Sequence, residues 1–287
     1  MPQTPLYPPS HPGLFDFPIR IDMLSRPLYP PSHPGLFDTH AHYDDNRYNS
    51  DADSVIRAAF SAGVGYILNA GCDVASSLAS VDFAERFGNI YASAGVHPHS
   101  AKSMTDDTID ILRAIARHPK VVAIGECGLD YYRGLSPRDV QRIGFEAQLE
   151  LAVELDMPVI VHCRDAIGDT LDTVRRYDLR GVFHSFSGSI EVARELVERG
   201  WYLSFAGPLT YKNATNLRDV FRTVPRERLL IETDCPYLTP EPKRGQRNDS
   251  SLLVHIAKVG AELLGMNLDD FVELTTENAK RLFNINC

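Results

Sequence analysis

Eight short apolar or β-branched runs alternate with longer amphipathic stretches along most of the chain. The runs cover residues 36 to 40, 66 to 70, 90 to 96, 121 to 126, 158 to 163, 181 to 186, 201 to 206 and 228 to 233. Strands that alternate with helical segments predict βα units and a parallel sheet. Since eight such units close a barrel, the sequence predicts an α/β fold of the (β/α)8 TIM-barrel type.

The 287 residues divide into two parts. Residues 1 to 34 are rich in proline, and the segment PLYPPSHPGLFD occurs at residues 5 to 16 and again at 27 to 38. Proline at this density favours extended backbone with few hydrogen bonds. We therefore expect residues 1 to 34 to form a disordered N-terminal extension and residues 35 to 287 to form one barrel domain.

Composition narrows the classes of function and location. No apolar run approaches the roughly 20 residues that span a bilayer, and the N-terminus lacks the pattern of a secretory signal. The five cysteines are irregularly spaced, which favours free thiols and a cytoplasmic location. The formal net charge of -9 is unlike that of a nonspecific nucleic-acid binder, so any such role must depend on a local patch or on metal ions. We expect a monomer.

Histidine and carboxylate side chains lie at or just beyond the ends of the predicted strands, where barrel enzymes build their sites. His40 and His42 are two residues apart, so both side chains lie on the same face of an extended strand. The full set is His40, His42, Glu126, His162, His184 and Asp234. This set predicts a metal site at the C-terminal ends of the strands.

The chemistry of the set favours divalent metal ions. Imidazoles together with carboxylates bind Zn, Mn, Mg or similar ions. A single histidine at a strand end is more often an ordinary polar residue, and a polar barrel rim is the alternative interpretation of the set. Six titratable groups at one barrel mouth favour metal binding, because each uncompensated buried charge costs several kcal/mol.

These residues belong to longer motifs that resemble those of the TatD family of metal-dependent deoxyribonucleases, in the amidohydrolase-like superfamily of barrels. The motifs are DTHAH (38 to 42), GVHPH (95 to 99), GECGLDYYR (125 to 133), HCRDA (162 to 166), HSFSGS (184 to 189), SFAGPLTYKNA (204 to 214) and ETDCPYLTP (232 to 240). The resemblance covers residues 35 to 285. One segment, PKRGQRNDS (242 to 250), departs from it, because Asp249 and Ser250 stand where the family usually has Glu-Pro.

The resemblance implies a role for each residue of the set. It implies that His40, His42 and Asp234 bind one metal ion, that His162 and His184 bind a second, and that Glu126 bridges the two. Asp234 and Glu126 are then the catalytic residues, with Asp234 also a candidate general base. The cofactors implied are two divalent ions, Mg, Mn or Zn.

The activity implied is 3′-5′ exonucleolytic cleavage of phosphodiester bonds in DNA, with single-stranded DNA as the partner. Two alternatives remain open on the sequence alone. One is hydrolysis of an ester or amide, such as aminoacyl-tRNA deacylation, since a pair of metal ions also polarises a carbonyl. The other is a noncatalytic nucleic-acid-binding barrel.

Four further residues are candidates for substrate binding. Arg164 follows His162 by two residues, and a guanidinium there suits a phosphate oxygen, although a salt bridge at the rim fits equally well. His97 follows the third predicted strand and is either a cavity residue or a capping histidine. Lys212 and Arg247 lie in loops after the seventh and eighth strands, where they attract a polyanion or are simply solvated.

Overall fold

The computed structural model describes residues 35 to 285, so the predicted N-terminal extension lies outside the described residues. One sheet of eight parallel strands runs in chain order from β1 to β8, which confirms the predicted barrel. The strands are β1 Leu36–Ala41, β2 Val64–Asn69, β3 Ile90–Ala94, β4 Val121–Asp130, β5 Val159–Arg164, β6 Gly181–Phe183, β7 Tyr202–Phe205 and β8 Leu229–Ile231.

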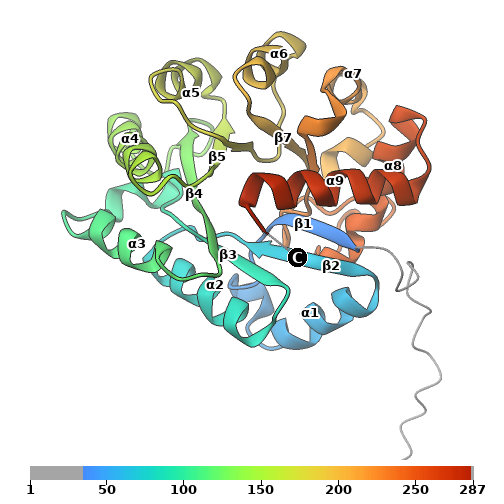
Figure 1. Ribbon diagram of the computed structural model, residues 1–287, viewed down its shortest axis with the longest axis horizontal. Helices are drawn as coiled ribbons and strands as arrows, with labels where there is room; N and C mark the ends of the chain where they lie inside the picture. Colours follow the sequence, from blue (N-terminus) through green and yellow to red (C-terminus); the bar gives the residue numbers. More distant parts are fainter. Residues whose placement is uncertain (1–34, 286–287) are drawn as a thin grey trace, which may run out of the picture.

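Helices surround this sheet, as Figure 1 shows. The α-helices are α1 Ala52–Ser61, α2 Val74–Arg86, α3 Thr108–Ala116, α4 Arg138–Leu155, α5 Ile167–Val174, α6 Ile190–Glu198, α7 Thr215–Thr223, α8 Leu253–Leu264 and α9 Leu268–Phe283. Short 3-10 helices lie in the connections: η1 Asn46–Tyr48, η2 Pro98–Ser103, η3 Gly207–Thr210, η4 Arg226–Arg228 and η5 Ser250–Leu252. Within residues 35 to 285 no single helix is long and apolar enough to span a membrane, and one pair, Ser250–Leu264 with Leu268–Phe283, passes that test only across a bend of 106°.

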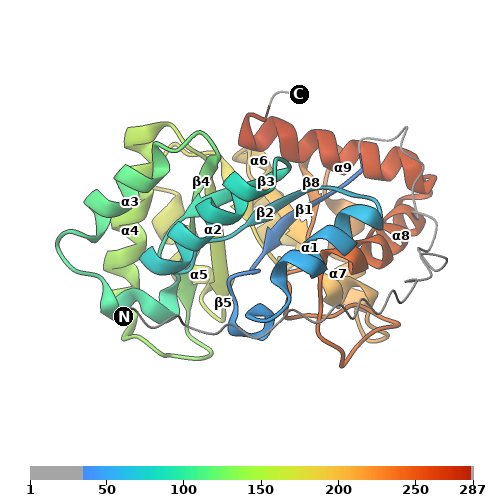
Figure 2. The same cartoon turned by 90° about the horizontal axis from the view of Figure 1, so that it is seen from below.

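The last helix, α9, closes one end of the barrel. In Figures 1 and 2 it lies across the barrel rather than beside a strand. Its apolar side chains pack with buried residues from the strands, namely Phe37, Leu68, Ala123, Ile160, Val182, Tyr202 and Leu230. Because these contacts fill the end at which the strands begin, the opposite end, where the strands finish, is left for a site.

Hydrogen bonds just beyond the ends of β1 and β8 join the first strand to the last. The amide of Asp234 donates to the carbonyl of His40 at 2.9 Å, and the amide of His42 donates to the carbonyl of Cys235 at 2.8 Å. The segment after β8 is thereby held against β1. This closure brings a carboxylate from the end of the chain beside two histidines from its beginning.

Two strand ends lie three or more residues away from the prediction. β4 was expected to end at Glu126 but continues to Asp130, and β6 ends at Phe183 rather than at residue 186. β4 continues because Gly128 pairs with His162 of β5. A Cβ at Gly128, which has φ +143°, would lie 2.0 Å from the carbonyl oxygen of His162, so only glycine allows this approach.

A chain that begins at Met23 is expected to fold and react as the full chain does. The first described strand begins at Leu36, so the deletion removes none of the described contacts. Thermal unfolding and activity of the two chains, compared side by side, test this expectation. A melting temperature lower by several degrees, or a loss of activity, would show instead that residues 1 to 22 stabilise the barrel.

Candidate metal centre

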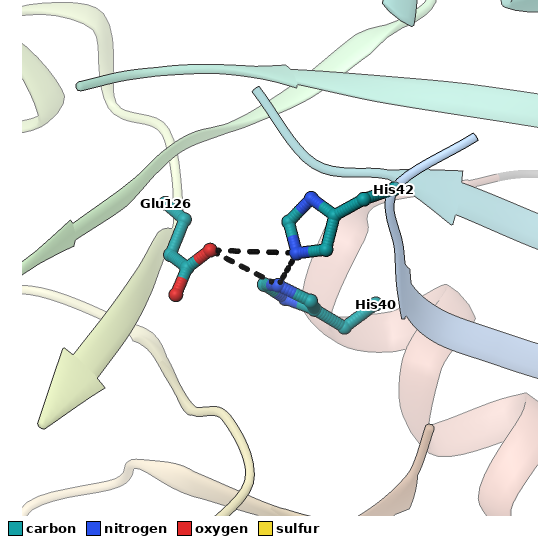
Figure 3. A group of neighbouring side chains, drawn as sticks. All are labelled: His40, His42 and Glu126. Carbon is teal, nitrogen blue, oxygen red and sulfur yellow. Dashed lines mark hydrogen bonds and ion pairs between the residues drawn. The ribbon is translucent and has the colours of Figure 1, made fainter. Parts of the chain in front are cut away.

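Three elements bring the first half of the predicted ligand set together. The Nε2 atoms of His40 and His42 are 3.1 Å apart, and Oε2 of Glu126 lies 3.2 Å from Nε2 of His40. Figure 3 shows these three side chains converging from β1 and β4. Oδ1 of Asp234, from the segment after β8, lies 3.4 Å from Nε2 of His42. All four side chains therefore face one point.

The other oxygen of the same glutamate faces a second group of histidines. Oε1 of Glu126 lies 2.8 Å from Nδ1 of His162 and 2.8 Å from Nε2 of His184, and these two nitrogens are 3.0 Å apart. Nε2 of His97 lies 3.4 Å from the same oxygen. The structure thus brings the six predicted ligands into one cluster, with Glu126 between its two halves.

The charges in this cluster depend on burial and on the mutual effects of its members. Burial alone would raise the pKa of Glu126, which is 2% exposed, but the imidazoles of His184, His97 and His40 hold that pKa well below its usual range. Burial and the neighbouring His184 lower the pKa of His40. Burial lowers the pKa of His97 to about 4. An ionised carboxylate therefore lies between ring nitrogens, some of which are held in the neutral form.

This donor set fits divalent metal ions. His40 and His42 direct ring nitrogens at one point only 3.1 Å apart, and Glu126 adds a carboxylate oxygen there. A second group of possible ligands, His97, Glu126 and His162, has donor atoms within 4.8 Å of one another. Imidazole nitrogens and carboxylate oxygens in such groups suit Zn, Mn and similar ions.

The backbone at Asp234 has an unusual conformation for a residue with a side chain. Its φ is +53°, in the left-handed region that residues other than glycine rarely adopt. Such residues cluster at functional sites, where the surrounding structure holds them in place. Here the hydrogen bond from the Asp234 amide to the His40 carbonyl holds the carboxylate beside the histidines.

The sequence prediction missed Asp130 and His99. Oδ2 of Asp130, at the end of β4, lies 3.2 Å from Nε2 of His162 and 2.8 Å from Nε2 of His99. Burial opposes ionisation of Asp130, but the hydrogen bond from His162 and its other bonds hold its pKa well below the usual range. Strand alternation could have indicated Asp130, because it lies four residues after Glu126 and therefore on the same face of β4. It was missed because the strand was predicted to end at Glu126.

A cavity of about 950 Å³ opens over the cluster, and both cationic and apolar side chains line it. Arg133, after β4, and Arg164, at the end of β5, line it, and neither makes an ion pair with any residue from 35 to 285. Apolar side chains from the segments after β6, β7 and β8 line it as well, among them Phe186, Pro208 of η3, Leu217 of α7 and Leu238. The cavity therefore offers both cationic and apolar contacts beside the ligand cluster.

The four predicted substrate-binding residues have different surroundings. His97 and Arg164 line the cavity, and the guanidinium of Arg164 lies 4.0 Å from the ring centroid of Tyr132. Lys212 and Arg247 are not among the described residues that line it. Arg247 forms an ion pair with Asp51 at 2.6 Å.

A barrel of eight parallel strands with histidine and carboxylate ligands at the ends of its strands defines a class, the metal-dependent hydrolases of the TIM-barrel type. Residues 37 to 284 match the model of the family described as TatD related DNase. The chain belongs to this family, which confirms the resemblance found in its motifs. It is an enzyme of the hydrolase class that acts on ester bonds.

Similar proteins cover almost the whole barrel. A Bacillus subtilis (strain 168) protein named "Uncharacterized metal-dependent hydrolase YabD" is 43% identical over 251 residues, 86% of this chain and 98% of that protein. The "3'-5' ssDNA/RNA exonuclease TatD" of Citrobacter koseri is 38% identical and covers 84% of this chain and 95% of its own length. The crystal structure of YJJV, a TatD homologue from Escherichia coli K12, has a TM-score of 0.82 at 30% identity, covering 88% of this chain and 98% of that chain.

Proposed function

We propose that this enzyme is a 3′-5′ exonuclease that removes nucleotides from single-stranded DNA and uses two divalent metal ions. The observation that carries the proposal is the position of Glu126, whose two oxygens face two separate groups of histidines. Family membership and relatives named as single-strand exonucleases favour nucleic acid as substrate. They do not favour aminoacyl-ester hydrolysis or a noncatalytic barrel.

The proposed ligands fall into two groups, one on each side of Glu126, and each group would hold one ion. His40, His42 and Asp234 would hold one ion, the histidines on the far side of the glutamate, His162 and His184, would hold the second, and Glu126 would contact both. Bound there, Mg, Mn or Zn ions would stabilise developing negative charge on the phosphate and lower the pKa of an attacking water.

Asp234 is the candidate general base. It lines the cavity, so its carboxylate can reach a water molecule placed beside a bound phosphodiester. Burial would raise its pKa, but the hydrogen bond from His42 and the charges of His184 and His40 lower it. A base must be ionised before it accepts a proton, and a carboxylate with a lowered pKa meets that condition at neutral pH.

The two cavity arginines and the tyrosine beside them suit a flexible single strand. Arg133 and Arg164 can bind phosphate oxygens in the fixed geometry of a guanidinium. Tyr132 is 61% exposed, and its ring can stack on a nucleobase that is not held in a duplex. The apolar part of the cavity, including Phe186 and Leu238, can receive a second base. The net charge of -9 makes these local contacts the main attraction for DNA apart from the metal ions.

The polarity and the substrate class are tested with a panel of labelled oligonucleotides. A 5′-labelled single-stranded DNA is expected to give a ladder that shortens one nucleotide at a time from the 3′ end. A fully paired duplex of the same sequence is expected to react more slowly, because paired bases do not enter the cavity. Release of labelled mononucleotide from the 5′ end, or faster cleavage of single-stranded RNA than of DNA, would contradict the proposal as stated.

Replacing Arg164 by alanine is expected to lower kcat/KM on single-stranded DNA by roughly ten- to a hundredfold, because one charge-assisted hydrogen bond to a phosphate is lost. Arg222→Ala, which removes an exposed arginine paired with Asp219 on α7, is the matched control and should leave the rate unchanged. Hydrolysis of bis(p-nitrophenyl) phosphate, which has no second phosphate, should be affected less by Arg164→Ala. Equal kcat/KM for wild type and Arg164→Ala on DNA would rule out the phosphate contact.

A further inference from the structure

Glu232 is a buried carboxylate behind the metal centre, directly after β8 and two residues before Asp234. It is 0% exposed. Its Oε1 accepts a hydrogen bond from the amide of Ser185 at 2.7 Å and lies 3.3 Å from Nδ1 of His184. His184 directs its other ring nitrogen at Glu126. Glu232 therefore contacts a proposed metal ligand from the side away from the metal.

The second oxygen of Glu232, Oε2, and one ring nitrogen of His40, Nδ1, are buried polar atoms without hydrogen-bond partners among the described residues. A ring nitrogen of His40, a ring nitrogen of His184 and a carboxylate oxygen of Glu232 all lie within 4.8 Å of one another. The rings of His40 and His184 are stacked, with centroids 4.1 Å apart. One carboxylate thus lies close to a histidine from each half of the cluster.

We infer that Glu232 is a positioning residue for both halves of the metal centre. It holds the Nδ1–H of His184 directly and the Nδ1–H of His40 through one buried water molecule. A single buried water suits two neighbouring buried polar groups that have no partner among residues 35 to 285. With both Nδ1 atoms protonated, the Nε2 atoms keep their lone pairs for metal ions on the two sides of Glu126.

The inference predicts a particular effect of Glu232→Gln, which keeps the size and shape of the side chain. A glutamine has one acceptor oxygen and one NH2 group in place of two acceptor oxygens. If its oxygen accepts from Ser185 and His184, its NH2 group faces the bridging water, which then no longer has a carboxylate oxygen to donate to. If the amide is flipped, it opposes the N–H groups of Ser185 and His184. In either orientation one of the two histidines loses its link to a carboxylate oxygen.

Calorimetric titration with Zn²⁺ tests this effect without any use of activity. Glu232→Gln is expected to bind Zn²⁺ about ten- to a hundredfold more weakly than wild type, the usual effect of removing such a partner. Glu198→Gln, on the exposed end of α6, is the matched control and should bind Zn²⁺ as wild type does. Circular dichroism shows whether each variant is folded.

Proton NMR of the Zn²⁺-loaded proteins gives a second readout that loss of stability alone would not produce. Wild type should show two slowly exchanging Nδ1–H resonances, assigned by their absence in His40→Asn and His184→Asn. Glu232→Gln should lose or shift at least one of them. The wild-type spectrum tests the inference even if Glu232→Gln fails to fold, because absence of either resonance from wild type would overturn it.

The inference rests on the proposed function only in taking His40 and His184 as metal ligands. Wild-type affinity for Zn²⁺ in Glu232→Gln, with both resonances unchanged, would overturn the inference and leave the nuclease proposal intact. Wild-type protein that binds Zn²⁺ but does not cleave DNA would overturn the nuclease proposal and leave this inference standing.

Discussion

Glu126→Gln is expected to lower kcat/KM on single-stranded DNA by at least about a thousandfold while the protein stays folded. Oε1 and Oε2 of Glu126 face different histidine groups, so the amide replaces a ligand oxygen on one side with an NH2 group that does not bind a metal ion. The metal ions are expected to contribute several kcal/mol to transition-state stabilisation, and each 1.36 kcal/mol lost is about a tenfold loss in rate.

Three measurements on one preparation of Glu126→Gln check this result. The first is kcat/KM, the second is metal content by mass spectrometry, and the third is the melting temperature. Folding should survive because the contacts of Glu126 that the structure gives are with polar side chains of the cluster rather than with the apolar core. Turnover close to wild type with unchanged metal content would contradict a bridging role for Glu126.

Asp234→Asn is expected to lower kcat by roughly a hundred- to ten-thousandfold, the range typical of a lost general acid or base. The asparagine keeps the size of the side chain and, through its backbone, the hydrogen bond to His40, but its amide does not accept the proton of an attacking water. The loss should persist at Mn²⁺ concentrations that restore full occupancy, because the missing step is the proton transfer.

Full recovery of kcat for Asp234→Asn at high Mn²⁺ would contradict the assignment of Asp234 as base and would leave it as a ligand only. Asp219→Asn, an exposed carboxylate on α7, is the matched control and should react as wild type does. A pH profile adds a further check: wild type should lose activity as acid protonates Asp234, whose pKa lies below its usual value.

The sequence predicted the fold and the composition of the cluster because both depend on periodicity. Alternation of strand and helix patterns indicated eight βα units. The two-residue spacing of His40 and His42 placed both on one face of a strand, and in the structure their Nε2 atoms are 3.1 Å apart. Closure of the barrel then brought Asp234 beside them, as the order of strands in a barrel requires.

The features that were missed depend on contacts between distant segments. Asp130 belongs to the cluster because β4 continues beyond Glu126, which in turn depends on the close approach of Gly128 to β5. The partner of Arg247 is Asp51, from a segment almost 200 residues earlier, and no local pattern indicates that ion pair. Glu232 is two residues before Asp234, so an extended segment would place both side chains on the same side. Its contact with His184, however, arises only when β6 and β8 are placed around the barrel.

Removal and return of metal test the central claim most directly. The full chain is stripped with a chelator, its metal content is measured, and its activity on 5′-labelled single-stranded DNA is followed as Mg²⁺, Mn²⁺ or Zn²⁺ is added back. The account predicts no cleavage by the metal-free protein and stepwise recovery that is complete at two bound ions per chain. Cleavage of the DNA at the original rate by protein shown to contain no metal would contradict it.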